Sequence, residues 1–265
     1  MSNNYPFKTV SINPNYRIGH EVQWDIEADF KGSIPFKFSV QLSDDLSFNN
    51  IISQTAPDDT FYTIESSKLV LNNNNNFLLR VKLEDGDGNE YFSKPQYLIT
   101  NLKDRQKYLY AAEIMRKELL LSERAGYRCK ALKRKVFGPS ILSKLDPVSG
   151  VPLTYEPTDF GTGVDGGYYR PFATYYRMEN IESEVKLNDQ GTGINDNTVL
   201  RVSLPGFPIL SVKDIIVTED DIRYIINSLN FKYFPGTNIV IKQTGMLNML
   251  PLSDKIYQLD ITKLS

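Results

Sequence analysis

Cysteine, histidine and tryptophan are nearly absent from this chain of 265 residues, which contains one of each. A lone Cys129 excludes an intrachain disulfide and is typical of a protein that folds in a reducing cytoplasm. A Ser-His-Asp triad would depend on His20 alone. Because His20 lies at the start of a predicted strand, away from any nucleophile motif, we expect a surface or strand-edge imidazole.

Long apolar runs are absent as well. No run approaches the roughly 18 residues that a membrane span requires. The first residues carry neither the basic nor the apolar region of a signal peptide. We therefore expect neither membrane insertion nor secretion by that route.

Motifs for cofactor or metal chemistry are incomplete. Gly161-x-Gly163-x-x-Gly166 matches a dinucleotide fingerprint, but the flanking residues, which include Pro171, cannot supply the required strand and helix. The run from Asp85 resembles the opening of an EF-hand loop, yet Glu90 replaces its sixth-position glycine. We expect a tight turn there, no cofactor and no enzymatic activity.

The pattern of the chain predicts a mainly β protein with three parts. Residues 1–100 alternate with period two, as in 36–42 and 77–83, and predict a β-sandwich. This segment resembles an immunoglobulin-like or fibronectin type III-like domain. Its expected core residues are Trp24, Phe36, Phe38, Val40, Leu79 and Val81.

Residues 101–126 predict one long connecting helix. Asn101 is a suitable N-cap, and Gly126 is placed to end the helix. Glu113 and Lys117 are spaced to pair across one turn. An apolar face is expected from Tyr108, Ala112, Met115 and Leu119. At this length the helix is expected to pack across a domain or between subunits.

Residues 127–265 predict a β-rich domain, either a small barrel or a second sandwich, that contains a glycine-rich loop. Turn signals such as Pro-Gly and Gly-Thr-Asn separate its segments. The expected strands are 127–136, 171–178, 197–204, 209–217, 223–229, 238–245 and 256–261.

Charge is unevenly distributed along the chain. Residues 1–100 carry eight basic and 13 acidic side chains, residues 101–144 carry 12 and four, and residues 145–265 carry ten and 15. A positive band between two acidic ends favours contact with an acidic neighbour or with phosphate, whereas the alternative is a solvated helix face and a basic edge strand. The candidate residues for DNA or intersubunit contact are Arg128, Lys130, Lys133, Arg134 and Lys135.

The most distinctive run comprises Asp146-Pro-Val-Ser-Gly150, Phe160-Gly-Thr-Gly163 and Gly166-Gly-Tyr-Tyr169. It resembles the central segment of tailed-bacteriophage virion proteins of the neck, or head-to-tail connector. In that pattern two CxxC pairs bracket an Asp-Pro-Val-Thr-Gly-like turn and lead into Gly-Thr-Gly-x-x-Gly-Gly-Tyr. Weaker strand motifs extend the resemblance over most of residues 105–260. The loop residues it implies are Asp146, Gly150, Gly161, Gly163, Gly166 and Gly167, where we expect positive φ and close backbone approach.

The metal ligands of the resembled pattern are missing. Alignment on the turn and the glycine run places the four lost ligand positions at Ile141, Lys144, Glu156 and Asp159. Zinc needs thiolate or imidazole ligands in a tetrahedral arrangement, so we expect no zinc here. A pairing of Lys144 with Glu156 or Asp159 would replace the ion as a link.

The resemblance implies a non-enzymatic virion protein that forms a homo-oligomeric ring of sixfold or twelvefold symmetry. Its implied partners are further copies of itself and the portal, adaptor or tail-completion proteins of the virion, after assembly in the host cytoplasm. A sequence-independent contact with DNA in the lumen is a further expectation for the basic band. The alternative function is a carbohydrate- or host-surface-binding decoration or baseplate module, which aromatic side chains exposed on one sandwich face would favour.

Overall fold

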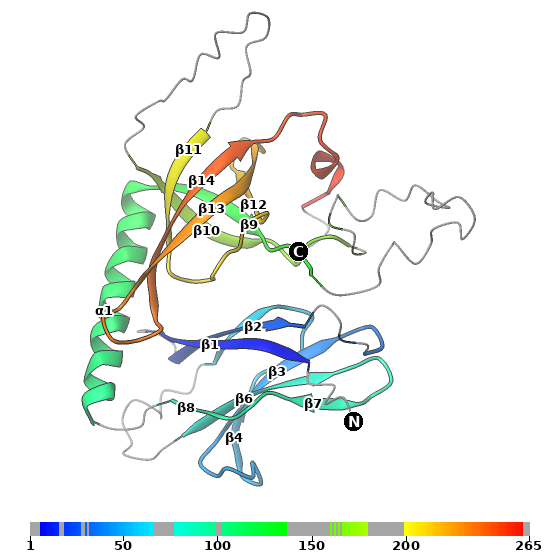
Figure 1. The fold of residues 1–265 in the computed structure, drawn as a ribbon, viewed down its shortest axis with the longest axis vertical. Coiled ribbons are helices and arrows are strands. Elements are labelled where there is room, and N and C mark those ends of the chain that lie inside the picture. Colours follow the sequence, from blue (N-terminus) through cyan, green and yellow to red (C-terminus); the bar gives the residue numbers. More distant parts are fainter. Residues whose placement is uncertain are drawn as a thin grey trace, which may run out of the picture.

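The computed structural model shows two β-structured parts, one above the other, with a single long helix beside both (Figure 1). The mainly β fold with one long helix is as predicted. The residues that the structure describes are 6–15, 19–27, 30, 32–65, 77–98, 102–136, 160, 162, 164, 166–179 and 199–261.

Residues 7–97 form a sandwich of two antiparallel sheets. The first sheet has the order β1-β2-β5, with β1 (Phe7–Asn15), β2 (Gly19–Ile26) and β5 (Tyr62–Glu65). The second has the order β4-β3-β6-β7, and β8 also pairs with β6. Its strands are β3 (Lys37–Ser43), β4 (Ile51–Gln54), β6 (Leu78–Glu84), β7 (Glu90–Phe92) and β8 (Gln96–Tyr97).

The sandwich core is the one predicted from the alternating pattern. All six expected core residues are less than 9% exposed, and the rings of Trp24 and Phe38 lie 5.3 Å apart. The predicted tight turn joins β6 to β7, where the Asp85 carboxylate accepts hydrogen bonds from the backbone N–H groups of Asp87 and Asn89. Asp85 therefore caps the turn between the two strands.

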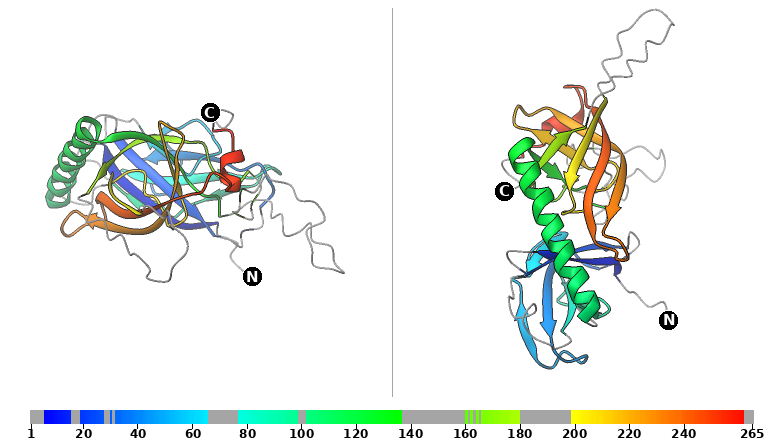
Figure 2. Two further views of the ribbon diagram at one scale, coloured as in Figure 1. Left: turned by 90° about the horizontal axis from the view of Figure 1, so that it is seen from above. Right: turned by 90° about the vertical axis from the view of Figure 1, so that its left-hand side faces the viewer.

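The long helix is α1 (Leu102–Ala125), whose 24 residues span about 36 Å. It contacts β1 of the sandwich and β9, β10, β11 and β14 of the other domain, as Figures 1 and 2 show. Tyr108, Ala111 and Ser122 are buried on its inner face, whereas Leu119 is 46% exposed. The prediction of Leu119 on the buried face is therefore wrong, because the covered stripe follows Ala111 and Met115 toward Ser122.

The end of α1 packs closely on the β domain at Gly126. A Cβ atom added there would lie 2.4 Å from the Ser122 carbonyl oxygen and 2.6 Å from that of Tyr176, so only glycine fits. The Arg177 guanidinium also lies 2.7 Å from the Glu118 carboxylate of the helix. The predicted pair of Lys117 and Glu113 is confirmed at 3.8 Å.

The second domain is a closed barrel of six antiparallel strands in the order β10-β11-β14-β13-β12-β9. This settles the choice between a barrel and a second sandwich. The strands are β9 (Tyr127–Leu132), β10 (Phe172–Met178), β11 (Val199–Pro205), β12 (Ile215–Thr218), β13 (Arg223–Tyr233) and β14 (Val240–Met249). Its interior is filled by buried side chains such as Val202, Ile216, Ile226 and Leu247.

Several predicted strand bounds of the barrel region are wrong. The strand expected over 127–136 ends at Leu132, and those expected over 223–229 and 238–245 extend to Tyr233 and Met249. Two further predictions are wrong in extent or type. The strand expected over 209–217 begins only at Ile215, because Asp214 accepts backbone hydrogen bonds and Lys213 has a φ of 75°. The strand expected over 256–261 is replaced by a short 3-10 helix, η4 (Lys255–Gln258), which the Asp254 side chain caps. Capping by Asp254 favours a turn over the extended backbone that Ile256 alone would suggest.

Candidate functional site

The sandwich and the barrel meet at a contact that we call the seam, formed by Gln23 and Tyr62 on one side and residues 207–211 and 133–135 on the other. The Gln23 amide donates to the Ile209 carbonyl oxygen at 2.8 Å and accepts from the Ile209 N–H at 2.7 Å. The Tyr62 ring lies edge-on to the rings of Phe172 and Phe207 at 5.3 and 5.5 Å. Directional hydrogen bonds and aromatic packing together fix how the two domains sit.

The second half of the basic band lies in the seam as the segment Lys133–Lys135. Lys133 is 6% exposed, and its ammonium donates to the Ser211 hydroxyl at 2.6 Å and lies 3.5 Å from the Asp214 carboxylate. Asp214 also accepts from the backbone N–H groups of Arg134 at 2.9 Å and Ser211 at 2.7 Å. Both members of this buried ion pair therefore also have hydrogen-bond partners within the chain.

The electrostatic balance of this pair depends on Lys133. Asp214 is 1% exposed, and burial raises the pKa of its carboxyl above the usual value. The Lys133 ammonium and the backbone N–H groups of Arg134 and Ser211 act in the opposite direction. A buried carboxylate of this kind stays charged only while its cation and its hydrogen-bond donors remain in place.

The glycine-rich loop and the basic band come together in space. Gly166 and Gly167 have φ values of 73° and 57°, which confirms the positive φ predicted for them. The Lys135 N–H donates to the Gly167 carbonyl oxygen at 2.9 Å. The Arg134 guanidinium donates to the Thr162 carbonyl oxygen at 2.8 Å. The loop is thus fastened to the segment that follows β9.

The same loop joins the barrel to the sandwich. Tyr169 is 5% exposed and belongs to the sandwich core, where its ring lies 5.3 Å from that of Phe61. Lys135 lies 3.4 Å from the Asp59 carboxylate, and Arg170 lies 3.5 Å from that of Asp58. Lys133, Arg134 and Lys135 therefore all make contacts inside the chain.

The first half of the basic band faces outward. In β9, Cys129 and Ala131 are buried, while Arg128 and Lys130 are exposed on the opposite face. We call Arg128 and Lys130 the outer-wall cations. Neither has a hydrogen-bond or ion-pair partner among the residues that the structure describes.

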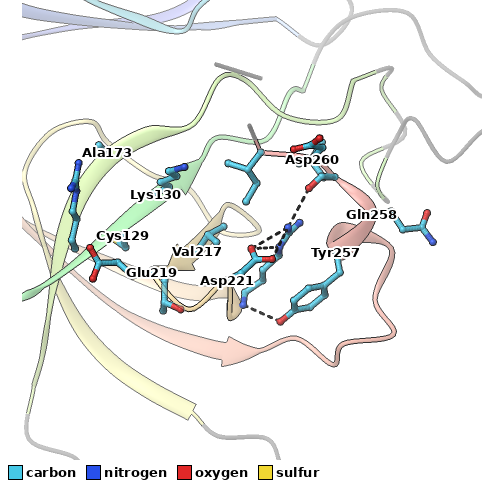
Figure 3. A pocket seen from close by; sticks show the side chains of 14 residues that line it. Cys129, Lys130, Ala173, Val217, Glu219, Asp221, Tyr257, Gln258 and Asp260 are labelled. Atoms are coloured by element: carbon cyan, nitrogen blue, oxygen red, sulfur yellow. Dashed lines mark hydrogen bonds and ion pairs between the residues drawn. The ribbon is translucent and has the colours of Figure 1, made fainter. Parts of the chain in front are cut away.

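An open depression of about 780 Å³ lies beside the outer-wall cations (Figure 3). Its lining includes Lys130 from β9 and the carboxylates of Glu219 and Asp260 from the β12–β13 turn and the C-terminal segment. The depression therefore carries basic side chains from one element and acidic side chains from two others. Side chains of both signs fit another protein surface better than a single small ion.

The acidic side of this depression is held in place by Arg223, a residue that the sequence did not single out. Arg223 is 3% exposed, pairs with Asp221 at 3.2 Å and donates to the carbonyl oxygens of Ile256 and, at 3.2 Å, Leu259. Figure 3 shows Asp221, Tyr257 and Asp260 around these interactions. A charged residue directly before the apolar and aromatic run 224–226 was the available signal.

The remaining candidates do not form a catalytic or metal site in the described chain. His20 is fully buried in β2, which lies between β1 and β5, and is 5.6 Å from the Tyr108 ring of α1, so the prediction of a surface or strand-edge imidazole is wrong. Burial raises the pKa of Cys129 to about 12. The described residues contain no group of three histidine, cysteine or acidic side chains arranged to hold a metal.

Several predicted positions lie outside the described residues. These are the lost ligand positions Ile141, Lys144, Glu156 and Asp159 and the loop residues Asp146, Gly150, Gly161 and Gly163. No helix in the described part of the chain combines the length and apolarity that a membrane crossing requires. No protein-family model, curated protein or solved structure matches the chain.

Proposed function

We propose that this chain is a non-enzymatic structural protein of a tailed-phage virion that forms a homo-oligomeric ring in the neck, or head-to-tail connector. The sequence support is the turn and glycine run from Asp146 to Tyr169. The structural observation that carries the proposal is the pair of outer-wall cations, Arg128 and Lys130, exposed and without described partners on a body whose two domains are joined at the seam.

The close joining of the two domains supports a role in assembly. The seam and α1 hold the sandwich and the barrel together through the Gln23–Ile209 pair, the buried Lys133–Asp214 pair and the long helix. Such a body loses little conformational entropy when it joins a neighbour, because few of its groups must become ordered on binding. A ring subunit benefits from this property.

The histidine and the cysteine, which nucleophilic catalysis would use, are both buried. His20 is fully buried against α1, and Cys129 is buried in the barrel, where its raised pKa keeps the thiol protonated. A reactive cysteine requires a lowered pKa and solvent access. Both placements favour a structural role for this chain.

The proposed contact for the outer-wall cations is the acidic surface of the next copy. The depression of one copy displays Arg128 and Lys130 near Glu219 and Asp260, so each copy offers both signs of charge. A head-to-tail contact between such surfaces builds a ring when its rotation closes. Phosphate of DNA in the lumen is the competing ligand for the same cations, and portal, adaptor or tail-completion proteins are the proposed axial neighbours.

The alternative of a carbohydrate-binding module has less support. Sugar sites commonly use exposed aromatic rings, and Tyr97, at 47%, is the one exposed aromatic side chain among the described residues of the sandwich. The other aromatic rings of the described sandwich are buried or partly buried. The sandwich surface therefore lacks the aromatic face that this function would favour.

Electron-microscopy class averages of the purified protein test the proposal. Closed rings of identical subunits are expected at micromolar concentration. Uniform monomers of 30.3 kDa at every concentration would contradict it. Screening of the same preparation on a glycan array tests the alternative, for which saturable binding without ring formation is the supporting result.

A further inference from the structure

Strand β13 is much longer than the strand that pairs with one of its edges. β13 pairs with β14 from Tyr224 to Tyr233, whereas β12 pairs only with residues 223–225. The last bonds on the β12 side are made by Ile226, whose carbonyl oxygen accepts from Lys213 N–H at 2.8 Å and whose N–H donates to Asp214 at 2.9 Å. Beyond Ile226, no described strand pairs with this edge. We call residues 227–233 on this side the free edge.

The free edge has few of the features by which proteins usually prevent strand pairing, which are shortness, charge, proline, β-bulges and a covering element. The pairing of β13 with β14 shifts register between Ile226 and Ser228 and again between Lys232 and Tyr233, and residues 228–232 stay in regular register between the two shifts. Residues 227–233 contain neither proline nor glycine, and Lys232 is their only charged residue. Phe231 and Tyr233 are 36% and 50% exposed on the same face of the strand.

Other sheet edges in the described chain are short or covered. β4 and β5 have four residues each, and β7 has three. β1 is longer, but α1 contacts it and the Gln96 amide donates to its Val10 carbonyl oxygen at 3.0 Å. In the barrel, β10 pairs with β11 only at Arg177 and Met178, but α1 contacts both strands. Apart from the covered β1, the free edge of β13 is the longest of these unpaired stretches, and we take it as the edge available for pairing.

We propose that the free edge of β13 pairs, main chain to main chain, with a strand of a second copy of this chain. A second copy is favoured because a single lysine in seven residues gives little charge repulsion between identical strands. Exposed Phe231 and Tyr233 add apolar and aromatic contacts to such a pairing. This inference rests on the proposed self-assembly and adds a main-chain contact to the one proposed for the outer-wall cations.

Hydrogen–deuterium exchange combined with native mass spectrometry tests the inference. On dilution of the wild-type protein from its assembled to its monomeric form, amide exchange in residues 227–233 should become at least about tenfold faster. The double variant Phe231→Lys, Tyr233→Lys should weaken assembly at least about tenfold, which corresponds to 1.4 kcal/mol. Leu252→Lys is the matched control, because Leu252 is 80% exposed and lies outside the strands, and it should assemble like wild type.

The outcomes separate this inference from the proposed function. Assembled protein whose residues 227–233 exchange as fast as in the monomer would overturn the edge pairing and leave the ring proposal standing. Absence of any oligomer would overturn both. The exchange measurement uses only the wild-type chain, so it decides the question even where the double variant misfolds.

Discussion

The seam and the outer wall take their cations from one short basic run and use them in opposite ways. In the seam, Lys133 is 6% exposed and pairs with Asp214, while Lys135 reaches Asp59 of the sandwich. On the outer wall, Arg128 and Lys130 are exposed and have no described partner. The seam cations hold the chain together, and the outer-wall cations are the ones left for another molecule.

The difference follows from strand geometry and from where β9 ends. Successive side chains of a strand point to opposite faces, so Arg128 and Lys130 share the outer face of β9. After Leu132 the chain leaves the barrel wall and enters the seam, where it meets Asp214 of the barrel and Asp59 of the sandwich. Charge density along a sequence therefore does not reveal how much charge remains for binding.

Removal of the seam carboxylate should have the largest effect. Asp214→Ala leaves the Lys133 ammonium buried without its counter-ion and removes the acceptor of two backbone N–H groups. We expect a loss of about 3–5 kcal/mol in the free energy of unfolding, measured by urea denaturation. Glu219→Ala, at an exposed carboxylate of the depression, is the control and should change this value by less than about 0.5 kcal/mol. A loss below about 1 kcal/mol for Asp214→Ala would show that the seam pair does not stabilise the fold.

Removal of the seam cation should make stability depend on pH. In Lys133→Met the burial of Asp214 acts unopposed by the ammonium, so the folded-state pKa of the carboxyl rises further above its unfolded value. A carboxyl whose pKa is raised in the folded state stabilises the protein fully at pH values below its unfolded-state pKa of about 3.9. This stabilisation is lost as the pH rises through the folded-state pKa. The free energy of unfolding of Lys133→Met, measured by urea denaturation, should therefore fall further below that of wild type between pH 4 and pH 8. The difference should reach about 3 kcal/mol at pH 8. A deficit independent of pH would contradict the assigned pairing.

The polar contact across the seam should have an intermediate effect. Gln23→Ala removes both hydrogen bonds to the Ile209 backbone, which should cost about 1–2 kcal/mol. Thermal unfolding followed by circular dichroism measures the loss. Gln54→Ala, which removes an amide on the far sheet, is the matched control. Equal effects of the two changes would show that Gln23 has no special role between the domains.

Substitutions on the outer wall should have the smallest effect on folding. Arg128→Ala and Lys130→Ala remove exposed side chains without described partners, so each should change the free energy of unfolding of the monomer by less than about 0.5 kcal/mol. Urea denaturation at a concentration below assembly measures it. A loss above about 1 kcal/mol for either residue would place it in the structural network with Lys133.

Local pattern was sufficient to predict the framework of the fold. Strand alternation identified the sandwich and its core, and the spacing of apolar residues together with Gly126 identified α1 almost to the residue. It was not sufficient where distant residues decide the structure. The burial of His20 depends on α1 lying over β2, and the core position of Tyr169 depends on the glycine loop reaching the sandwich.

The sequence predicted which basic residues matter, but not which of them lie in the seam and which lie on the outer wall. The sequence identified the basic run from Arg128 to Lys135, and the pairing of Lys133 with Asp214 spans 81 positions that no local pattern connects. The sequence also did not reveal that Arg223 binds the C-terminal segment. Arg223 donates to the backbone carbonyl oxygens of Ile256 and Leu259, which are distant in sequence. Backbone acceptors leave no signature in residue identity.

Native mass spectrometry of an outer-wall charge reversal tests the central claim most directly. The double variant Arg128→Glu, Lys130→Glu is compared with wild type and with Lys8→Glu, Lys37→Glu, a control with the same charge change at exposed lysines of the sandwich. Wild type and control should form the same oligomer, and the outer-wall variant should be mainly monomeric with unchanged stability. An outer-wall variant that keeps the wild-type oligomer would contradict the assignment of these cations to contacts between copies.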